Sequence, residues 1–236
     1  MEPDETDRPG APSNEMSTFI RAKDRAPRVE VQETWYGFRY AGLRTTPNGY
    51  THVRMTEVIL PWTTRVATLP LSNPLGFGSM VPRDDYTCWR GAGGMTVANT
   101  GRQESPKGGI APMNQNQRND FLIDREKQKT FSYPGILGIN QQDMAVTESM
   151  GPIYQRDSEH LGTTDGAIIK MRRMLIKAAK DLANGIEPKT ADTSLPFEKI
   201  RSAERIILPG DDWRKLGTEE DPMMAELPIA AASAVN

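Results

Sequence analysis

The longest regular pattern in this sequence is an amphipathic segment in its last third. Apolar residues recur there at helical spacing from Ile168 to Leu182. The polar run 163–165 precedes the segment and offers an N-cap, and Gly185 follows it, where glycine commonly ends a helix. The sequence therefore predicts one helix over residues 165–184. We expect four side chains to pack this helix beneath a sheet: Ile168, Met171, Leu175 and Leu182.

Upstream segments alternate apolar and polar residues, which is typical of half-buried strands. Residues 28–34 alternate, and so do residues 36–41 after a short break. The pattern resumes over residues 50–60, and Asn48 and Gly49 between the two regions form a typical turn sequence. The economical arrangement is an antiparallel meander with a hairpin at this turn.

A shorter helix is predicted from about residue 140 to residue 150, where Gly151 and Pro152 would stop it. Because strand patterns come first and helical patterns follow, the sequence predicts an α+β fold and not a series of βαβ units. Five prolines and two glycine clusters between residues 69 and 117 predict long loops. The glycine clusters lack the spacing of a phosphate-binding loop.

Charge and cysteine content exclude several classes of partner and site. Lys and Arg number 29 and Asp and Glu number 31, so the net charge of -2 provides no field to hold a nucleic acid. A single cysteine, Cys88, allows no intramolecular disulfide and no thiolate zinc site within this chain. The sequence holds no run of about 18 apolar residues and no signal-peptide core near its start. We expect a cytoplasmic protein with no membrane span and no nucleic-acid partner.

Both ends of the sequence have the composition of tails. Residues 1–25 are charged with little apolar periodicity, so we expect a disordered N-terminal tail. Residues 216–236 drift into Ala and Met without a cap or turn signal, so we expect a flexible C-terminal tail. Residues 26–215 remain as the folded domain.

The chemistry-bearing residues show no paired metal-ligand spacing. The two histidines, His52 and His160, lie far apart in the sequence. His52 shares a strand face with Arg54, and we interpret both histidines as structural residues more readily than as ligands. Cys88 is predicted to be a small packed residue, because no neighbouring His or Lys would activate its thiol.

The most specific region of the sequence is 118–162. With the strand segments 27–31 and 36–41 upstream, it closely resembles the C-terminal catalytic domain of Rieske non-haem iron oxygenases of the phthalate 4,5-dioxygenase type. The resemblance covers roughly residues 25–215. The runs that carry it within this region are 118–128, 135–143, 148–153 and 159–165.

The resemblance implies a fold and a metal. In that family the catalytic domain is a helix-grip (START-like) fold, in which a curved antiparallel sheet wraps over a long C-terminal helix. Two histidines and one carboxylate hold Fe(II) there, a ligand set that leaves positions open for O₂ and water. Asp143 matches the carboxylate, and Asn140 and Gln142 are candidates to donate hydrogen bonds that support it. Without the resemblance, Asp143 would be interpreted as a carboxylate interacting with a helix dipole.

The sequence also departs from the family pattern. The segments that supply the two iron histidines and the Cys and His ligands of the [2Fe–2S] cluster have no counterpart here. We therefore expect an incomplete helix-grip domain that offers Fe(II) one ligand, contains no cluster site and is inactive alone. The implied partners are a missing N-terminal half or a separate Rieske-containing chain, together with a reductase.

Three interpretations remain open. In the first, the chain belongs to an oxygenase component acting on an aryl carboxylate or aryl ether, and Arg39 or Arg44 pairs with the substrate carboxylate. For each arginine the competing interpretation is a solvent-facing strand residue. In the second, the chain is a non-catalytic module whose helix-grip cleft holds an apolar ligand or a partner subunit. In the third, the start is misassigned and the protein is longer.

Overall fold

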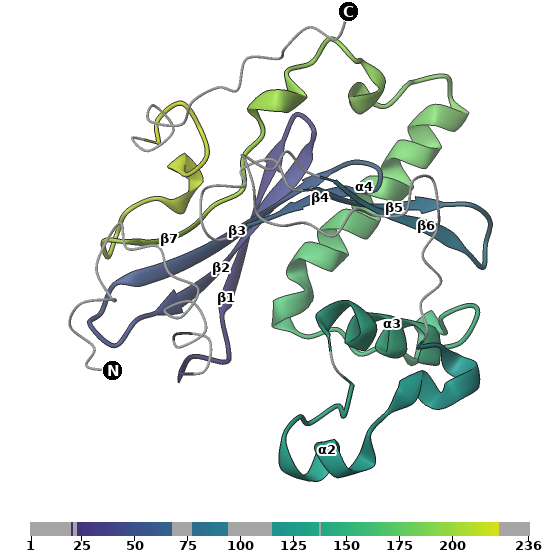
Figure 1. Ribbon diagram of the computed structural model, residues 1–236. Helices are drawn as coiled ribbons and strands as arrows, with labels where there is room; N and C mark the ends of the chain where they lie inside the picture. Colours follow the sequence, from purple (N-terminus) through teal and green to yellow (C-terminus); the bar gives the residue numbers. More distant parts are fainter. Residues whose placement is uncertain (1–19, 21–22, 68–76, 94–114, 137, 222–236) are drawn as a thin grey trace, which may run out of the picture. The chain divides into compact units, whose positions relative to one another are not determined.

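The computed structural model describes residue 20 and residues 23–67, 77–93, 115–136 and 138–221. The chain divides into two compact units (Figure 1). Unit 1 comprises Met1–Val81, Trp89–Ala98 and Leu161–Asn236, and unit 2 comprises Pro82–Cys88 and Asn99–His160. Each unit is described by itself.

A curved antiparallel sheet forms the centre of unit 1 (Figure 1). Its strands follow the order β1-β2-β3-β4-β5-β6, and β7 pairs with β3. The first half of β3 pairs with β7, and its second half pairs with β4. The strands are β1 (Arg28–Thr34), β2 (Gly37–Thr45), β3 (Thr51–Ile59), β4 (Thr63–Val66), β5 (Phe77–Pro82), β6 (Cys88–Gly93) and β7 (Glu204–Ile207).

The predicted hairpin is confirmed between β2 and β3. The backbone N–H of Gly49 donates to the carbonyl of Thr46 at 2.9 Å, and the N–H of Thr46 donates to the carbonyl of Tyr50 at 2.9 Å. Gly49 has a φ of 80°, in the left-handed region that glycine enters without strain. Turn chemistry therefore sets the register of the two strands.

One face of the sheet packs against the helix α4 (Gly166–Ala183). Phe38 and Val58 are buried there against Ala167, with Met171 and Met174 partly buried around them. The helix ends before Gly185, which has a φ of 80°. The predicted helix and the α+β helix-grip fold are both confirmed.

The predicted inward side of this helix was partly wrong. Ile168 is 39% exposed and Leu182 is 54% exposed, whereas Met171 packs as expected and Leu175 is half-buried. The helix carries apolar residues around much of its circumference, so periodicity alone leaves the direction of its packing face open by about one residue, a rotation of ~100°.

The opposite face of the sheet is covered by the C-terminal segment. The side chains of Trp213 and Leu216 are buried there against residues of β2 and β3, including Leu43 and Met55. Packing continues past the predicted domain end at residue 215, because Asp221 is 2% exposed and accepts a hydrogen bond from Arg205 at 2.5 Å.

The region predicted to be loops, residues 69–117, contains the strands β5 and β6. Residues 68–76 and 94–114 lie outside the described part of the chain. Cys88, at the start of β6, is exposed, so the prediction of a packed thiol was wrong.

The remaining elements are helical, and among them α3 confirms the predicted shorter helix. No described helix has the length and apolar character that crossing a membrane requires. The helices of unit 2 are η1 (Gln117–Leu122), α2 (Arg125–Thr130), α3 (Ile139–Ser149) and η2 (Arg156–Ser158). Those of unit 1 besides α4 are η3 (Thr163–Asp165), η4 (Lys189–Ala191), η5 (Phe197–Lys199) and η6 (Trp213–Lys215).

Candidate functional site

Asp143 lies on α3 in unit 2, with its side chain exposed. The helix starts after Gly138, whose φ of 94° turns the chain into it. The hydroxyl of Thr147 donates to the backbone carbonyl of Asp143 at 2.6 Å. Within the described residues, no hydrogen bond or ion pair engages the Asp143 carboxylate, so both of its oxygens are available to a ligand.

Gln142 and Asn140 lie beside Asp143 on the same helix. The Gln142 side-chain amide donates to the carbonyl of Ile136 at 2.7 Å, which ties the start of α3 to the preceding turn. This contact limits the directions in which the first turn of the helix can point. The side chain of Asn140 lies outside the described part of the chain. Support of a metal ligand by these two residues stays a prediction.

The described residues do not form a complete Fe(II) site. They contain no group of three His, Cys, Asp or Glu side chains that could hold a metal ion. His160, in the same unit as Asp143, is exposed. Because a facial triad requires three protein donors, Asp143 alone does not complete a site for this metal.

His52 is buried in unit 1 and contacts Glu204. It is 1% exposed on β3, and its Nε2 lies 3.0 Å from Oε1 of Glu204 on β7. The Nε of Arg54 lies 3.5 Å from the other oxygen of the same carboxylate. The predicted shared face of His52 and Arg54 is confirmed, but their acidic partner is 152 residues away from His52 and carried no signal in the sequence.

Arg39 is buried among the chain's own acceptors. Its Nη1 donates to the carbonyl of Leu216 at 3.0 Å, its Nε donates to Gln32 at 2.7 Å, and its Nη2 donates to the carbonyl of Arg214. The guanidinium also lies 5.6 Å from the centre of the Trp213 ring. These contacts fasten the C-terminal segment to the sheet, and a substrate role for Arg39 stays a prediction.

Arg44 points to the other face of the sheet. It is half-buried, pairs in register with His52, and therefore shares the face that α4 covers. Its Nε donates to the backbone carbonyl of Asp24 at 2.9 Å. A substrate role for Arg44 also stays a prediction.

A buried polar cluster was not predicted from the sequence. Glu57 on β3 is 1% exposed, accepts a hydrogen bond from the Tyr36 hydroxyl, and pairs in register with the buried Arg65 of β4. Burial raises the pKa of Glu57 to about 7, against the opposing effects of the Tyr36 hydrogen bond and of the positive charges of Arg39 and Arg65. Burial likewise raises the pKa of the Tyr36 hydroxyl above its ordinary value. The signal available was an acidic residue in line, at every second position of β3, with Val53, Met55 and Ile59.

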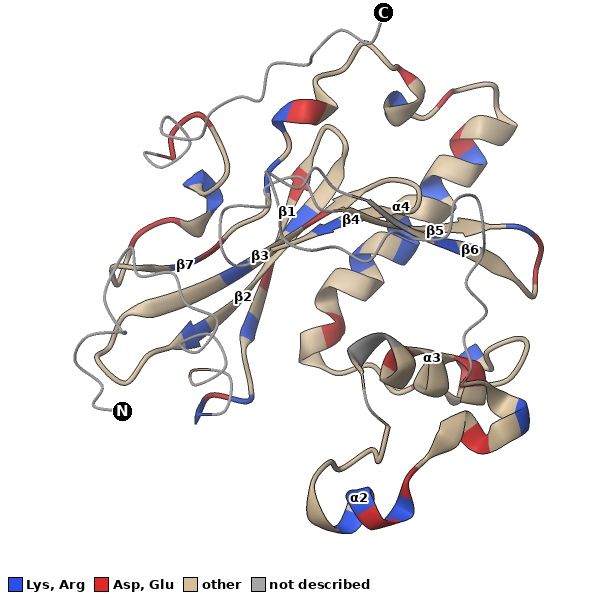
Figure 2. Cartoon of the chain, in the orientation of Figure 1, with Lys and Arg blue, Asp and Glu red and all other residues tan. Residues whose placement is uncertain are grey.

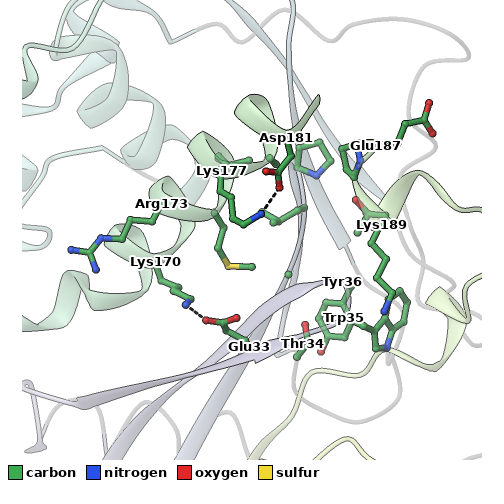
Figure 3. A pocket seen from close by; sticks show the side chains of 18 residues that line it. Glu33, Thr34, Trp35, Tyr36, Lys170, Arg173, Lys177, Asp181, Glu187 and Lys189 are labelled. Atoms are coloured by element: carbon green, nitrogen blue, oxygen red, sulfur yellow. Dashed lines mark hydrogen bonds and ion pairs between the residues drawn. The ribbon is translucent and has the colours of Figure 1, made fainter. Parts of the chain in front are cut away.

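Unit 1 contains a cavity of about 400 Å³ (Figure 3). Its walls are the turn between β1 and β2, one side of α4 from Lys170 to Asp181, and the segment 187–190 that follows the helix. Lys and Arg predominate along the exposed side of α4 (Figure 2). The cavity lies at the end of the helix-covered face and combines apolar walls with a charged mouth.

Comparison with known families assigns the chain to one of them. The sequence profile of the family described as "LigXa C-terminal domain like" matches residues 5–231. The chain belongs to this family. The match covers nearly the whole sequence and agrees with the resemblance seen in residues 118–162.

Two relatives extend the assignment. The chain is 32% identical over 223 residues to a phthalate 4,5-dioxygenase oxygenase subunit of Pseudomonas putida, an alignment that covers 87% of this chain and 50% of the relative. It is 28% identical over 214 residues to a 3-chlorobenzoate-3,4-dioxygenase oxygenase subunit of Comamonas testosteroni, covering 80% of this chain and 49% of the relative. The chain thus spans about half the length of both relatives.

Proposed function

We propose that this chain is the carboxylate-bearing part of the catalytic domain of an aromatic-ring-hydroxylating oxygenase, and that Asp143 is its iron ligand. The observation that carries the proposal is the 32% identity, over 87% of the chain, to an oxygenase subunit. The free, exposed carboxylate of Asp143 on α3 supports the residue assignment. A ligand carboxylate must be available to the metal, and this one is unengaged by the described residues.

In this proposal, a different part of the oxygenase supplies the two iron histidines and the [2Fe–2S] ligands. That part corresponds to the half of each relative that lies outside the alignment. The relatives are about twice as long as the aligned region, which leaves room for such a half. Electrons would come from a reductase component. The 236-residue polypeptide by itself is expected to turn over no aromatic substrate, because one carboxylate does not hold Fe(II) in a defined geometry.

The proposed substrate is an aryl carboxylate, with an aryl ether as the alternative class. The names of both relatives refer to aromatic carboxylic acids. We assign recognition of the substrate carboxylate to Arg39 or Arg44, whose side chains lie on opposite faces of the sheet. A guanidinium binds a carboxylate through two parallel hydrogen bonds, which fixes the orientation of the ring as well as its charge.

The test is reconstitution of the complete oxygenase. The chain is combined with a polypeptide that carries the cluster and histidine segments, and iron content and NADH-driven oxygen uptake with an aryl carboxylate are measured. We expect stoichiometric iron and turnover only in the combination. Asp143→Ala should abolish both, whereas Asp157→Ala, which removes an exposed carboxylate from the same unit, should abolish neither. Stoichiometric iron in the isolated chain that survives Asp143→Ala would contradict the proposal.

A second candidate function is a non-catalytic ligand-binding module. The cavity of about 400 Å³ in unit 1 is the observation that favours it. Under this alternative the reconstituted mixture would show no oxygen uptake with any aromatic acid, although the chain would still bind a small molecule. The same experiment therefore separates the two functions.

A further inference from the structure

The side of α4 that faces away from the sheet carries an apolar stripe. Ile169, Ile176 and Ala183 are spaced seven residues apart, and residues at this spacing return to nearly the same side of a helix. Ile176 is 57% exposed, Ala183 is exposed and Ile169 is half-buried. Ile168 and Leu182, which are also exposed, border these three residues. We call Ile169, Ile176 and Ala183 the outer stripe.

The packing of unit 1 leaves the outer stripe uncovered. Ala167 is the buried contact of α4 with the sheet, and Met171 and Met174 pack beside it. Ile176 follows Ala167 by nine positions, which is about two and a half turns of a helix. Ile176 therefore points directly away from the sheet, and the folding of unit 1 by itself does not account for an isoleucine at this position.

The spacing of the outer stripe matches that of a second helix. Two helices pack along one another when apolar residues recur about every 3.5 residues, so that single positions repeat every seven. α4 has 18 residues, a length of ~27 Å, and the outer stripe extends through two of these repeats. A strand presents side chains to one face at every second residue and does not match this repeat. The spacing thus indicates a helix as the occupant of this side of α4.

Positive charge flanks the outer stripe. Residues three or four positions apart are neighbours on a helix, so Arg172 and Arg173 adjoin Ile169. Lys180 adjoins Ile176 in the same way. Arg173 and Lys180 are exposed, and no ion pair joins either of them to another residue that the structure describes.

The positive charge of α4 is not a general property of the sequence. The helix contains five Lys or Arg residues and one Asp, a net charge of +4, whereas the complete sequence has -2 and the remaining residues therefore carry -6. Figure 2 shows the Lys and Arg residues distributed along α4. A partner that pairs with this helix is therefore expected to be acidic.

We propose that the outer side of α4 docks a helix of another protein, one whose apolar stripe is flanked by Asp and Glu. The apolar residues of this helix pack on the outer stripe, and its carboxylates pair with Arg173 and Lys180. A second copy of this chain would bring identical cations against these two side chains, which like-charge repulsion disfavours. The docking surface lies wholly on unit 1 and is independent of Asp143 and of the proposed substrate.

The test measures the binding of labelled synthetic peptides to the full chain by fluorescence anisotropy. The acidic probe is a peptide of about three heptads with Ile or Leu along one face and Glu on both sides of that face. One control peptide has Lys in place of each Glu, and the other has Ser in place of each Ile and Leu. We expect the acidic probe to bind with a Kd about tenfold or more below that of either control, and to bind more weakly as the salt concentration rises.

Variants of exposed residues locate this binding on α4. Ile176→Glu should abolish binding of the acidic probe, because it places a negative charge within the outer stripe. The double variant Arg173→Glu with Lys180→Glu should reverse the preference, so that the lysine peptide binds and the acidic probe does not. The matched control is Lys199→Glu with Lys215→Glu, which changes two exposed lysines of unit 1 outside α4 and should leave the preference unchanged. Circular dichroism establishes that each variant is folded.

The proposal is overturned if the acidic probe does not bind, if the lysine peptide binds equally well, or if binding survives Ile176→Glu in a folded protein. Two other occupants are tested with the same variants. Self-association of the chain that Ile176→Glu abolishes, measured by sedimentation, would identify a second copy as the occupant. Flotation with phosphatidylglycerol vesicles that the double variant of Arg173 and Lys180 abolishes would identify a lipid surface. Either result would also overturn the proposal.

Discussion

At the scale of single residues, Glu57 is the clearest case of a charge controlled by burial. Its pKa is raised to about 7 chiefly because burial disfavours the anion. The folded state therefore keeps a proton that the unfolded chain, with a pKa near 4.5, has already released. Because the folded state binds this proton more tightly than the unfolded chain does, the free energy of unfolding falls as pH rises from about 4.5 through 7.

We predict that Glu57→Gln removes this pH dependence. Between pH 4.5 and pH 8 the unaltered protein should lose about 1–3 kcal/mol of its free energy of unfolding relative to the variant. The variant lacks the carboxyl group that titrates, so it should not show this loss. Urea denaturation at several pH values measures it. Glu126→Gln, which alters an exposed glutamate, should leave the profile unchanged. An identical profile for Glu57→Gln and the unaltered protein would contradict the assigned cause.

The buried pair of Arg205 and Asp221 gives a second prediction at this scale. Their side chains are 9% and 0% exposed, and Asp221 also accepts the backbone N–H of Gly217 at 2.8 Å. Asp221→Ala should lower the free energy of unfolding by about 3–5 kcal/mol, because it leaves the guanidinium buried without its counter-ion. Glu219→Ala, two residues earlier and 94% exposed, should cost little. Equal effects would mean that the chain beyond residue 215 is not part of the folded unit.

At the scale of elements, α4 shows how a helix face is selected by the sheet beneath it. Ala167 is 5% exposed between Phe38 and Val58, and the small side chain allows close approach of the helix to β2 and β3. Residues with larger aliphatic side chains on the same helix, such as Ile168, point to solvent. Shape at the contact, and not hydrophobicity alone, decides which side of the helix is inside.

We predict that Ala167→Leu destabilises the protein by about 1–3 kcal/mol through overpacking against Phe38 and Val58. Ala179→Leu adds the same atoms at an exposed position of the same helix and should be nearly neutral. Thermal or chemical denaturation of the two variants measures the difference. A neutral Ala167→Leu would show that α4 can move away from the sheet at no cost.

At the scale of the whole molecule, the chain is a helix-grip unit accompanied by a second, largely helical unit that carries Asp143. The sheet of unit 1 has both faces covered, one by α4 and the other by the C-terminal segment. Unit 2 has few buried apolar side chains in its described part, Phe121 and Ile136 among them. The proposed iron ligand, Asp143, would need further contacts to fix its geometry, which agrees with the proposal that iron is held only in the complete oxygenase.

The sequence by itself determined the elements and the family. The family rests on likeness to known sequences, which the family match over residues 5–231 confirms. The hairpin at Asn48 and Gly49 and the helices over residues 139–149 and 166–183 rest on spacing and turn chemistry over short stretches. These signals are local, because a helix repeats every ~3.6 residues and a strand every two.

Only the tertiary structure decided which partners these elements meet. The contact of His52 with Glu204, the engagement of Arg39 by Leu216, and the inward turn of Ala167 in place of Ile168 join residues more than a hundred positions apart. A buried polar group is stable only where a matching partner is brought to it, and the fold alone sets that distance. The sequence therefore shows the residue type at each strand position, but the residues that contact that position in the folded structure decide its role.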